Sequence, residues 1–169
     1  LADAVAATES GVITMKASEK LSDMVTITEN ANITLDLAGK AITVPKAVNG
    51  RSLYAITNNG TFTLMDSVGG GKISSRGTQN FGTMTVNSGT IESIDSNGGG
   101  ASVWNEGGTL TVNGGSLNTT GERSGSNAAT AINNLGGVVT IEKDANFDCT
   151  YHAVMNNKST DGATGGKTT

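Results

Sequence analysis

The stretch Asn58-Asn59-Gly60-Thr61-Phe62-Thr63-Leu64 decides the fold, because its chemistry returns three more times along the chain. The later copies begin at Asn80, Asn105 and Asn134, and each leads through a Gly into a strand that alternates apolar residues with Thr or Val. An earlier segment, Asn32 to Leu35, keeps the same register without the leading Asn-x-Gly. Spacings of 29, 22, 26 and 29 residues separate the equivalent positions Ile33, Phe62, Met84, Leu110 and Val139. Periods in this range are typical of stacked repeat folds.

Each repeat holds three strand-like pieces. One ends in the Asn, the second carries Thr-x-Thr, and the third follows a Gly, as in Gly89-Thr90-Ile91. Three short strands per turn predict a parallel β-helix, in which equivalent strands of successive rungs pair about 4.8 Å apart. Because side chains alternate along a strand, we expect apolar columns inside (Phe62, Leu64, Met84, Val86, Leu110, Val112, Val139, Ile141) and threonines outside (Thr61, Thr63, Thr83, Thr85, Thr109, Thr111).

The leading Asn of each repeat lies where the chain turns between two faces. Stacked Asn side chains can donate from rung to rung and can satisfy turn groups that the sheets leave unpaired. The sequence therefore predicts a buried asparagine ladder, mainly structural, at Asn58, Asn80, Asn105, Asn134 and Asn156.

The composition fits one strand-rich domain. The 169 residues include 24 Gly, one Pro and only 4% aromatics, which suits short strands joined by tight turns. The one helical pattern, over residues 1–8, predicts a cap on the open end of the stack. We expect a β-helix domain over residues 1–157, with the capping helix within 1–10, and a polar tail or linker over 158–169. Because Leu1 is not an initiator Met, we also expect a processed product or a piece of a longer chain.

Charge and cysteine content narrow the possible partners. A net charge of −4 does not favour nucleic acid, which usually requires a basic face, and no apolar stretch approaches the ~20 residues of a membrane span. The single cysteine, Cys149, excludes an intrachain disulfide. A homo-oligomer and a place in a larger assembly both fit this sequence.

The repeat pattern, with the preceding segment Ile33 to Thr43, resembles the pectate-lyase-like right-handed β-helix domains found in bacterial surface adhesins and in phage fibre or tailspike proteins. The resemblance covers about residues 1–157 and includes the opening Leu1 to Val5, which is similar to their capping helix. It implies an all-β fold: a single-stranded, right-handed parallel β-helix with three strands per rung and a short N-terminal cap. It does not fix a function, because catalytic and non-catalytic members share the fold.

The acidic residues do not form a catalytic pattern. Polysaccharide lyases and hydrolases on this scaffold cluster acids and bases on one outer face, and glycoside hydrolysis needs two carboxylates about 5 to 9.5 Å apart. Here the acids are scattered, and none recurs at equivalent positions of adjacent rungs. Cys149 and His152 are close in sequence but lack an evident third group to orient them. We therefore predict no catalytic residues, no cofactor and no metal site.

Trp104 is the most informative outward residue. If Val103 points inward, Trp104 points out, between Gln79 and Asn133 of the neighbouring rungs. An indole between amides can contact another subunit, can stack on a sugar ring whose hydroxyls the amides bind, or can lie under a loop. Gln79, Trp104 and Asn133 are thus the candidate ligand or subunit contacts.

These observations favour a non-enzymatic structural or adhesive module of an extracellular, cell-surface or virion-surface protein (fibre, decoration protein or adhesin), presenting a rigid face to glycan or protein partners. One alternative is a polysaccharide depolymerase of tailspike type, with catalytic residues between copies. Another is an ice-binding β-solenoid using the Thr-x-Thr repeats. Irregular rung lengths and bulky loops argue against a regular threonine lattice, and Thr is also simply a good outward β-strand residue.

Overall fold

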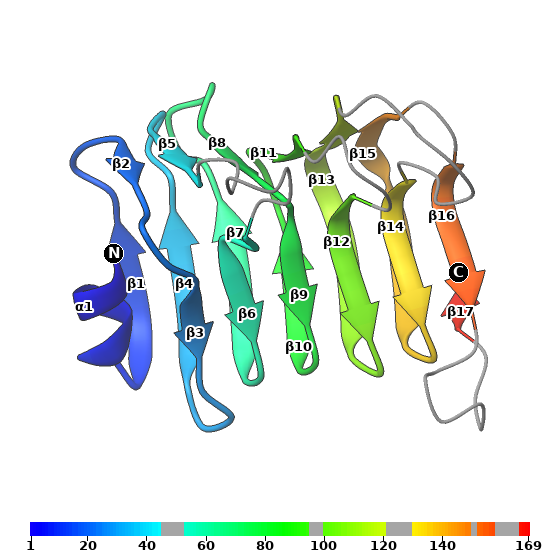
Figure 1. Ribbon diagram of the computed structural model, residues 1–169, viewed down its shortest axis with the longest axis horizontal. Coiled ribbons are helices and arrows are strands. Elements are labelled where there is room, and N and C mark those ends of the chain that lie inside the picture. The colour runs from blue at the N-terminus through cyan, green and yellow to red at the C-terminus, as the bar shows by residue number, and fades with distance from the viewer. Residues whose placement is uncertain (45–52, 95–99, 121–129, 150–151, 158–165) are drawn as a thin grey trace.

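The chain folds as a parallel β-helix. The computed structural model describes residues 1–44, 53–94, 100–120, 130–149, 152–157 and 166–169. Within these residues one helix, α1 (Ala2–Ala6), precedes strands β1 to β17, and the named strands pair in parallel with strands of the next rung. The rungs stack side by side along the long axis, from α1 at one end to β16 and β17 at the other (Figure 1).

Three faces wrap around the axis. The first face contains β1 (Ser10–Thr14), β4 (Asn32–Asp36), β7 (Thr61–Met65), β10 (Thr83–Val86), the first halves of β13 (Thr109–Thr119) and β15 (Val138–Asp148), and β17 (Lys167–Thr168). The second contains β2 (Glu19–Lys20), β5 (Ala41–Thr43), β8 (Lys72–Ser75), β11 (Thr90–Ser93) and the later halves of β13 and β15. The third contains β3 (Val25–Ile27), β6 (Ile56–Asn58), β9 (Thr78–Asn80), β12 (Ala101–Glu106), β14 (Thr130–Leu135) and β16 (His152–Asn157).

The first two faces are continuous at one end of the molecule. Strands β13 and β15 run through the turn between them, with a shift of register between Val112 and Gly114. The two faces therefore form one 11-stranded sheet, while the third face is a separate 6-stranded sheet. The predicted all-β solenoid with three strands per rung is confirmed.

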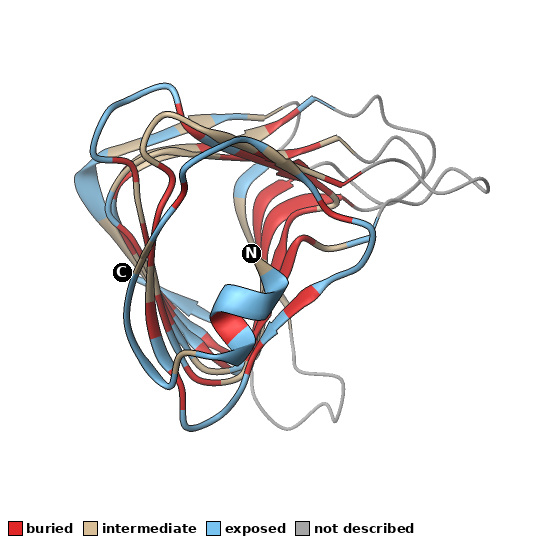
Figure 2. Cartoon of the chain, turned by 90° about the vertical axis from the view of Figure 1, so that its left-hand side faces the viewer, coloured by how far each residue is buried: buried red, intermediate tan, exposed pale blue. Residues whose placement is uncertain are grey.

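The core fills the space that the three faces enclose, and Figure 2 shows the buried residues lining it. Ile33, Phe62, Met84, Leu110 and Val139 stack in register as one column, each at most 1% exposed. The other predicted inward residues are also buried, except Ile141, which is only half-buried on the last full rung. The predicted outward threonines of β7, β10 and β13 are exposed or half-buried. Alternation along each strand thus separates core from surface as predicted.

The asparagine ladder is present over its full predicted length. Nδ2 of Asn58 donates to Oδ1 of Asn80 (2.7 Å), and the same bond links Asn80 to Asn105 (2.7 Å), Asn105 to Asn134 (2.8 Å) and Asn134 to Asn156 (2.8 Å). Each of the first four also donates to the carbonyl of the glycine that precedes the following strand. Because Asn58, Asn80, Asn105 and Asn134 are fully buried, the ladder satisfies turn groups that water does not reach.

The turn after each asparagine requires glycine for reasons of space. A Cβ on Gly82 would overlap the carbonyl oxygen of Gly60 on the rung below, and one on Gly108 would lie 2.6 Å from Nδ2 of Asn80. Backbones of successive turns therefore approach more closely than any side chain permits. The Asn-x-Gly motif is a packing requirement of the stack.

Helix α1 lies across the N-terminal end of the core (Figure 2). Its Val5 is buried, and Leu1 packs against the same core. The helix covers Ala2–Ala6, shorter than the eight residues of the sequence pattern. The predicted cap is confirmed.

Three features near the ends differ from simple extrapolation of the repeat. The two-residue strand β2 and the later half of β15 complete the second face where no Gly-led strand was expected. The tail predicted over 158–169 lies partly outside the described residues. Of the remainder, β17 pairs with β15, Lys167 opposite Val138 and Thr168 opposite Val139.

Candidate functional site

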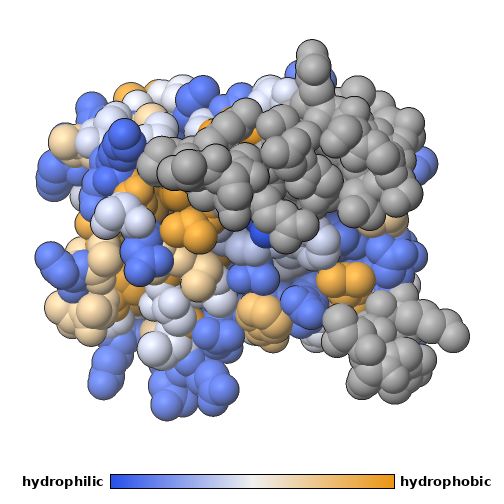
Figure 3. All heavy atoms as spheres, in the orientation of Figure 1, coloured by the Kyte–Doolittle hydropathy of each residue, from blue (hydrophilic) through white to orange (hydrophobic). Residues whose placement is uncertain are grey.

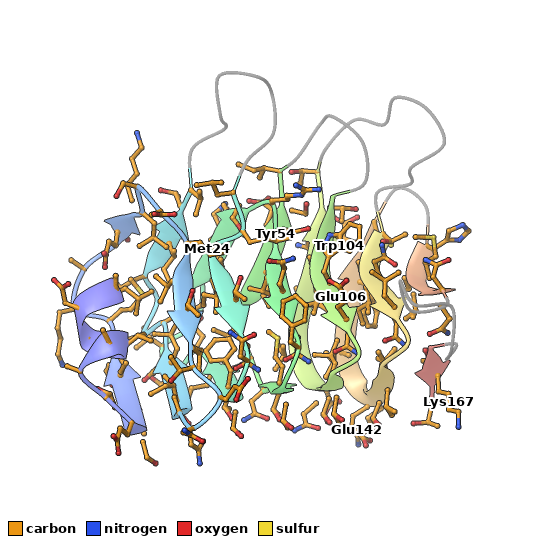
Figure 4. All side chains as sticks on the ribbon, turned by 60° about the horizontal axis from the view of Figure 1, so that its bottom comes forward. Met24, Tyr54, Trp104, Glu106, Glu142 and Lys167 are labelled. Carbon is orange, nitrogen blue, oxygen red and sulfur yellow. The ribbon has the colours of Figure 1, made fainter. Side chains whose placement is uncertain are left out.

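The outward residues of the third face form the candidate site. In register they are Thr57 of β6, Gln79 of β9, Trp104 of β12 and Asn133 of β14, and we call them the Trp104 column. The structure thus places Gln79 and Asn133 directly beside Trp104. Trp104 is half-buried, and in Figure 4 it lies in one row with Met24 and Tyr54 along the long axis.

Hydrogen bonds within the column leave donors available. Oε1 of Gln79 accepts from the Thr57 hydroxyl (3.2 Å), and Oδ1 of Asn133 accepts from Nδ2 of Asn157 (3.0 Å). Within the described residues the amide nitrogens of Gln79 and Asn133 have no partner, and the buried Nε1 of Trp104 has none either. Two amide donors therefore flank the aromatic ring, which suits a ligand rich in acceptor oxygens, whereas Nε1 of Trp104 is too buried to reach such a ligand in this conformation.

Side chains from other positions pack near the N-terminal end of the Trp104 column. Sδ of Met24 lies 2.7 Å from the Thr57 hydroxyl and is the alternative acceptor to Oε1 of Gln79 for its one proton, and Thr57 is only 8% exposed although it points outward. Arg76 stacks over the ring of Tyr54, 4.9 Å from its centroid, as a cation–π pair. Met24 is 38% exposed, and hydrophobic residues appear among hydrophilic ones on this side of the molecule (Figure 3). The sequence did not indicate these contacts, because Met24, Tyr54 and Arg76 lie outside the repeated Asn-x-Gly-Thr motif.

Two aspartates accept hydrogen bonds from the turn between the first and second faces. Oδ1 of Asp36 accepts from the backbone N–H groups of Ala38 and Ser67 (both 2.9 Å), and its Oδ2 accepts from the Ser67 hydroxyl (2.7 Å). The backbone and side-chain hydrogen bonds from Ser67 lower the pKa of Asp36. Both bonds favour the ionised carboxylate, so this acid is used as a structural acceptor.

Asp66 has the same role on the next rung. Its carboxylate accepts from the backbone N–H of Gly39 (2.7 Å) and of Gly71 (2.6 Å). Burial alone would raise the pKa of Asp66, but these backbone hydrogen bonds outweigh it and lower the pKa. On the second face, Oε2 of Glu92 accepts from the Ser74 hydroxyl (2.6 Å) and from Nζ of Lys72 (3.3 Å). These three acids are therefore engaged in fixed contacts.

Cys149 and His152 lie near the C-terminal end of the stack. Cys149 is a half-buried free thiol at the edge of the core, and His152 is exposed at the start of β16. Among the described residues no group of three or more His, Cys, Asp or Glu side chains is arranged to hold a metal ion. The same residues contain no helix long and apolar enough to cross a membrane.

Comparison of the chain with protein-family models, with curated proteins and with solved structures finds no match. The parallel β-helix is thus established by the structure itself, while the resemblance to pectate-lyase-like domains of adhesins and phage fibres stays a prediction.

Proposed function

We propose that this chain is a non-enzymatic binding module of a cell-surface or virion-surface protein, a rigid β-helix that presents the Trp104 column to a glycan or protein partner. The observation that carries the proposal is the half-buried indole of Trp104 between Gln79 and Asn133, whose amide nitrogens have no partner within the described residues. Aromatic rings with adjacent donors recur in binding sites because stacking and directed hydrogen bonds act together.

The scaffold supports this role by holding the column rigid. The asparagine ladder joins five rungs by side-chain hydrogen bonds of 2.7 to 2.8 Å, and buried apolar columns run parallel to it. Side chains on neighbouring strands therefore keep a fixed spacing before a ligand arrives. Preorganisation of this kind lowers the entropy that binding would otherwise cost.

The placement of the acids supports a non-catalytic role. The carboxylates of Asp36 and Asp66 accept hydrogen bonds from backbone N–H groups, and both carboxyl groups have lowered pKa values. Glu92 accepts hydrogen bonds from Ser74 and Lys72. A general acid of a glycosidase needs the opposite shift, a raised pKa. Asp36 and Asp66 are therefore suited to stabilising turns rather than to protonating a leaving group.

A single assay tests the proposal. The purified chain is screened against bacterial surface polysaccharides, with release of reducing ends followed in the same wells, and against the proteins of candidate host surfaces. Trp104→Ala is the test variant, and Phe81→Ala is the matched control, because Phe81 is an aromatic residue 42% exposed in the turn between the third and first faces. Binding that Trp104→Ala abolishes and Phe81→Ala retains would support the proposal. Release of ends would overturn the non-enzymatic role and favour a depolymerase.

A further inference from the structure

The first face carries a regular array of threonines. Thr61, Thr83 and Thr109 pair in register across β7, β10 and β13, and Thr63, Thr85 and Thr111 do so beside them. We call these six residues the threonine face. Thr34 and Thr140 continue the second row by one rung on each side. None of these strand pairs is interrupted by a bulge between the threonines.

Unequal rung lengths do not disturb this face, because the extra residues lie elsewhere along the chain. The link from the third face to the first takes two residues in four successive rungs: 59–60, 81–82, 107–108 and 136–137. By contrast, the chain between second-face and third-face strands varies from the two residues 76–77 to the twelve residues 44–55. Irregular repeats therefore do not count against a lattice of threonines on this face.

The threonine hydroxyls are available to a ligand. Within the described residues none of the six makes a side-chain hydrogen bond to protein. Outward polar residues of the other faces are more often paired, as Ser74 is with Glu92 and Thr57 with Gln79. If Thr were here only as a good strand former, similar rows would be expected on all three faces. The register concentrates them on one.

The face is also uncharged. Between Asn32 and Thr140 the outward residues in the rows of the six threonines are Asn, Thr and Val, and none of these described residues carries a charge. A charged ligand would therefore gain little affinity from electrostatic attraction to this face. A row of Thr side chains offers alternating hydroxyl and methyl groups, which fits a neutral lattice that both donates and accepts hydrogen bonds.

The spacing of the array is close to the spacing of oxygens in ice. Equivalent threonines on neighbouring strands are about 4.8 Å apart, and the two on one strand are about 6.7 Å apart. In a tetrahedral water network with hydrogen bonds of about 2.75 Å, next-nearest oxygens are about 4.5 Å apart and the stacking repeat of hexagonal ice is about 7.3 Å. We propose that the threonine face binds the surface of ice crystals, a second binding surface separate from the Trp104 column.

Ice-affinity partition tests this directly. Ice is grown slowly from a dilute solution of the chain, and the protein frozen into the ice is compared with the protein left in the liquid. Thr83→Lys places a charged side chain at the centre of the array, and Thr26→Lys, at another exposed strand threonine but on the third face, is the matched control. Circular dichroism melts verify that both variants fold.

We expect the wild-type chain and Thr26→Lys to enter the ice and Thr83→Lys to be excluded. Exclusion of the wild-type chain to the level of a protein that does not bind ice would overturn the proposal. Retention of folded Thr83→Lys at the wild-type level would also overturn it. If Thr83→Lys does not fold, the wild-type partition decides alone. Trp104→Ala should enter the ice like wild type, so the outcome is independent of glycan or protein binding.

Discussion

Asn80 donates its side-chain amide to Oδ1 of Asn105 at 2.7 Å, across two rungs that are 25 residues apart in sequence. The same nitrogen also donates to the carbonyls of Gly82 and Thr109. One buried side chain therefore fixes its own turn, the turn above it and the start of the next strand. Repeated along the axis, this arrangement makes the ladder the principal polar element of the core.

Removal of one ladder residue should be strongly destabilising. In Asn105→Ala the buried Nδ2 of Asn80 and Oδ1 of Asn134 lose a partner, and each unsatisfied buried group costs about 1 to 3 kcal/mol. We expect a loss of about 2 to 5 kcal/mol in the free energy of unfolding, measured by urea denaturation. The control is Asn113→Ala, which removes an exposed Asn–Asn bond of 2.8 Å and should change stability by no more than about 0.5 kcal/mol. Equal losses in the two variants would contradict the buried ladder.

A methyl group in the Asn-x-Gly turn should separate successive rungs. The added Cβ of Gly82→Ala meets the backbone of Asn59 and Gly60, which cannot rotate away. We expect a loss of at least about 3 kcal/mol, at the upper end of overpacking effects. Gly107→Ala is the matched control in a neighbouring turn: it has open space around the new methyl but a φ of +73°, and should cost only about 1 to 2 kcal/mol. Thermal melts that rank the two in the opposite order would argue against the close approach.

Replacing a core phenylalanine should destabilise the fold far more than replacing a surface phenylalanine. Phe62 is 1% exposed in the central apolar column, whereas Phe81 is 42% exposed. Phe62→Ala should cost about 3 to 5 kcal/mol because it opens a cavity in a close-packed interior. Phe81→Ala should cost no more than about 0.5 kcal/mol. Denaturation midpoints of the two variants provide the measurement, and a large loss for Phe81→Ala would place it in the core instead.

Acid should destabilise the turns that use Asp36 and Asp66. Both pKa values lie below the ordinary value of 3.8, so the folded state binds fewer protons than the unfolded state in this range. The stabilisation is fully present above about pH 5, where the unfolded-state carboxylates are ionised too, and is lost as the pH falls through the lowered folded-state pKa values. We expect the free energy of unfolding to fall between about pH 5 and pH 3.

Asp66→Asn isolates one of these contributions. An amide cannot accept with both of its polar atoms, so one of the bonds from Gly39 and Gly71 is lost. We expect lower stability near pH 7 and a smaller decrease between about pH 5 and pH 3 than in wild type. A decrease as large as that of wild type would show that Asp66 does not contribute to the pH dependence.

Much of the fold follows from the sequence because the repeat is periodic within each rung. The Asn, the Gly and the alternating strand recur together, so the inward column of Phe62 and Leu64 and the outward Thr61 and Thr63 could be assigned from spacing alone. The same spacing placed Trp104 between Gln79 and Asn133. The strands β2 and β17 were not predicted, because a two-residue strand is too short to show the alternation of apolar and polar residues.

The sequence by itself determined the stacked β-helix, the division of each strand into core and surface, and the positions of the ladder asparagines. All three depend on local spacing, which is the same wherever a rung lies. Only the tertiary structure decided which groups outside the repeated motif meet across rungs: Asp66 with Gly39, and Thr57 with Met24. These contacts join residues 20 or more positions apart in the sequence. Because the rungs differ in length, the sequence separation alone does not fix which residues become neighbours.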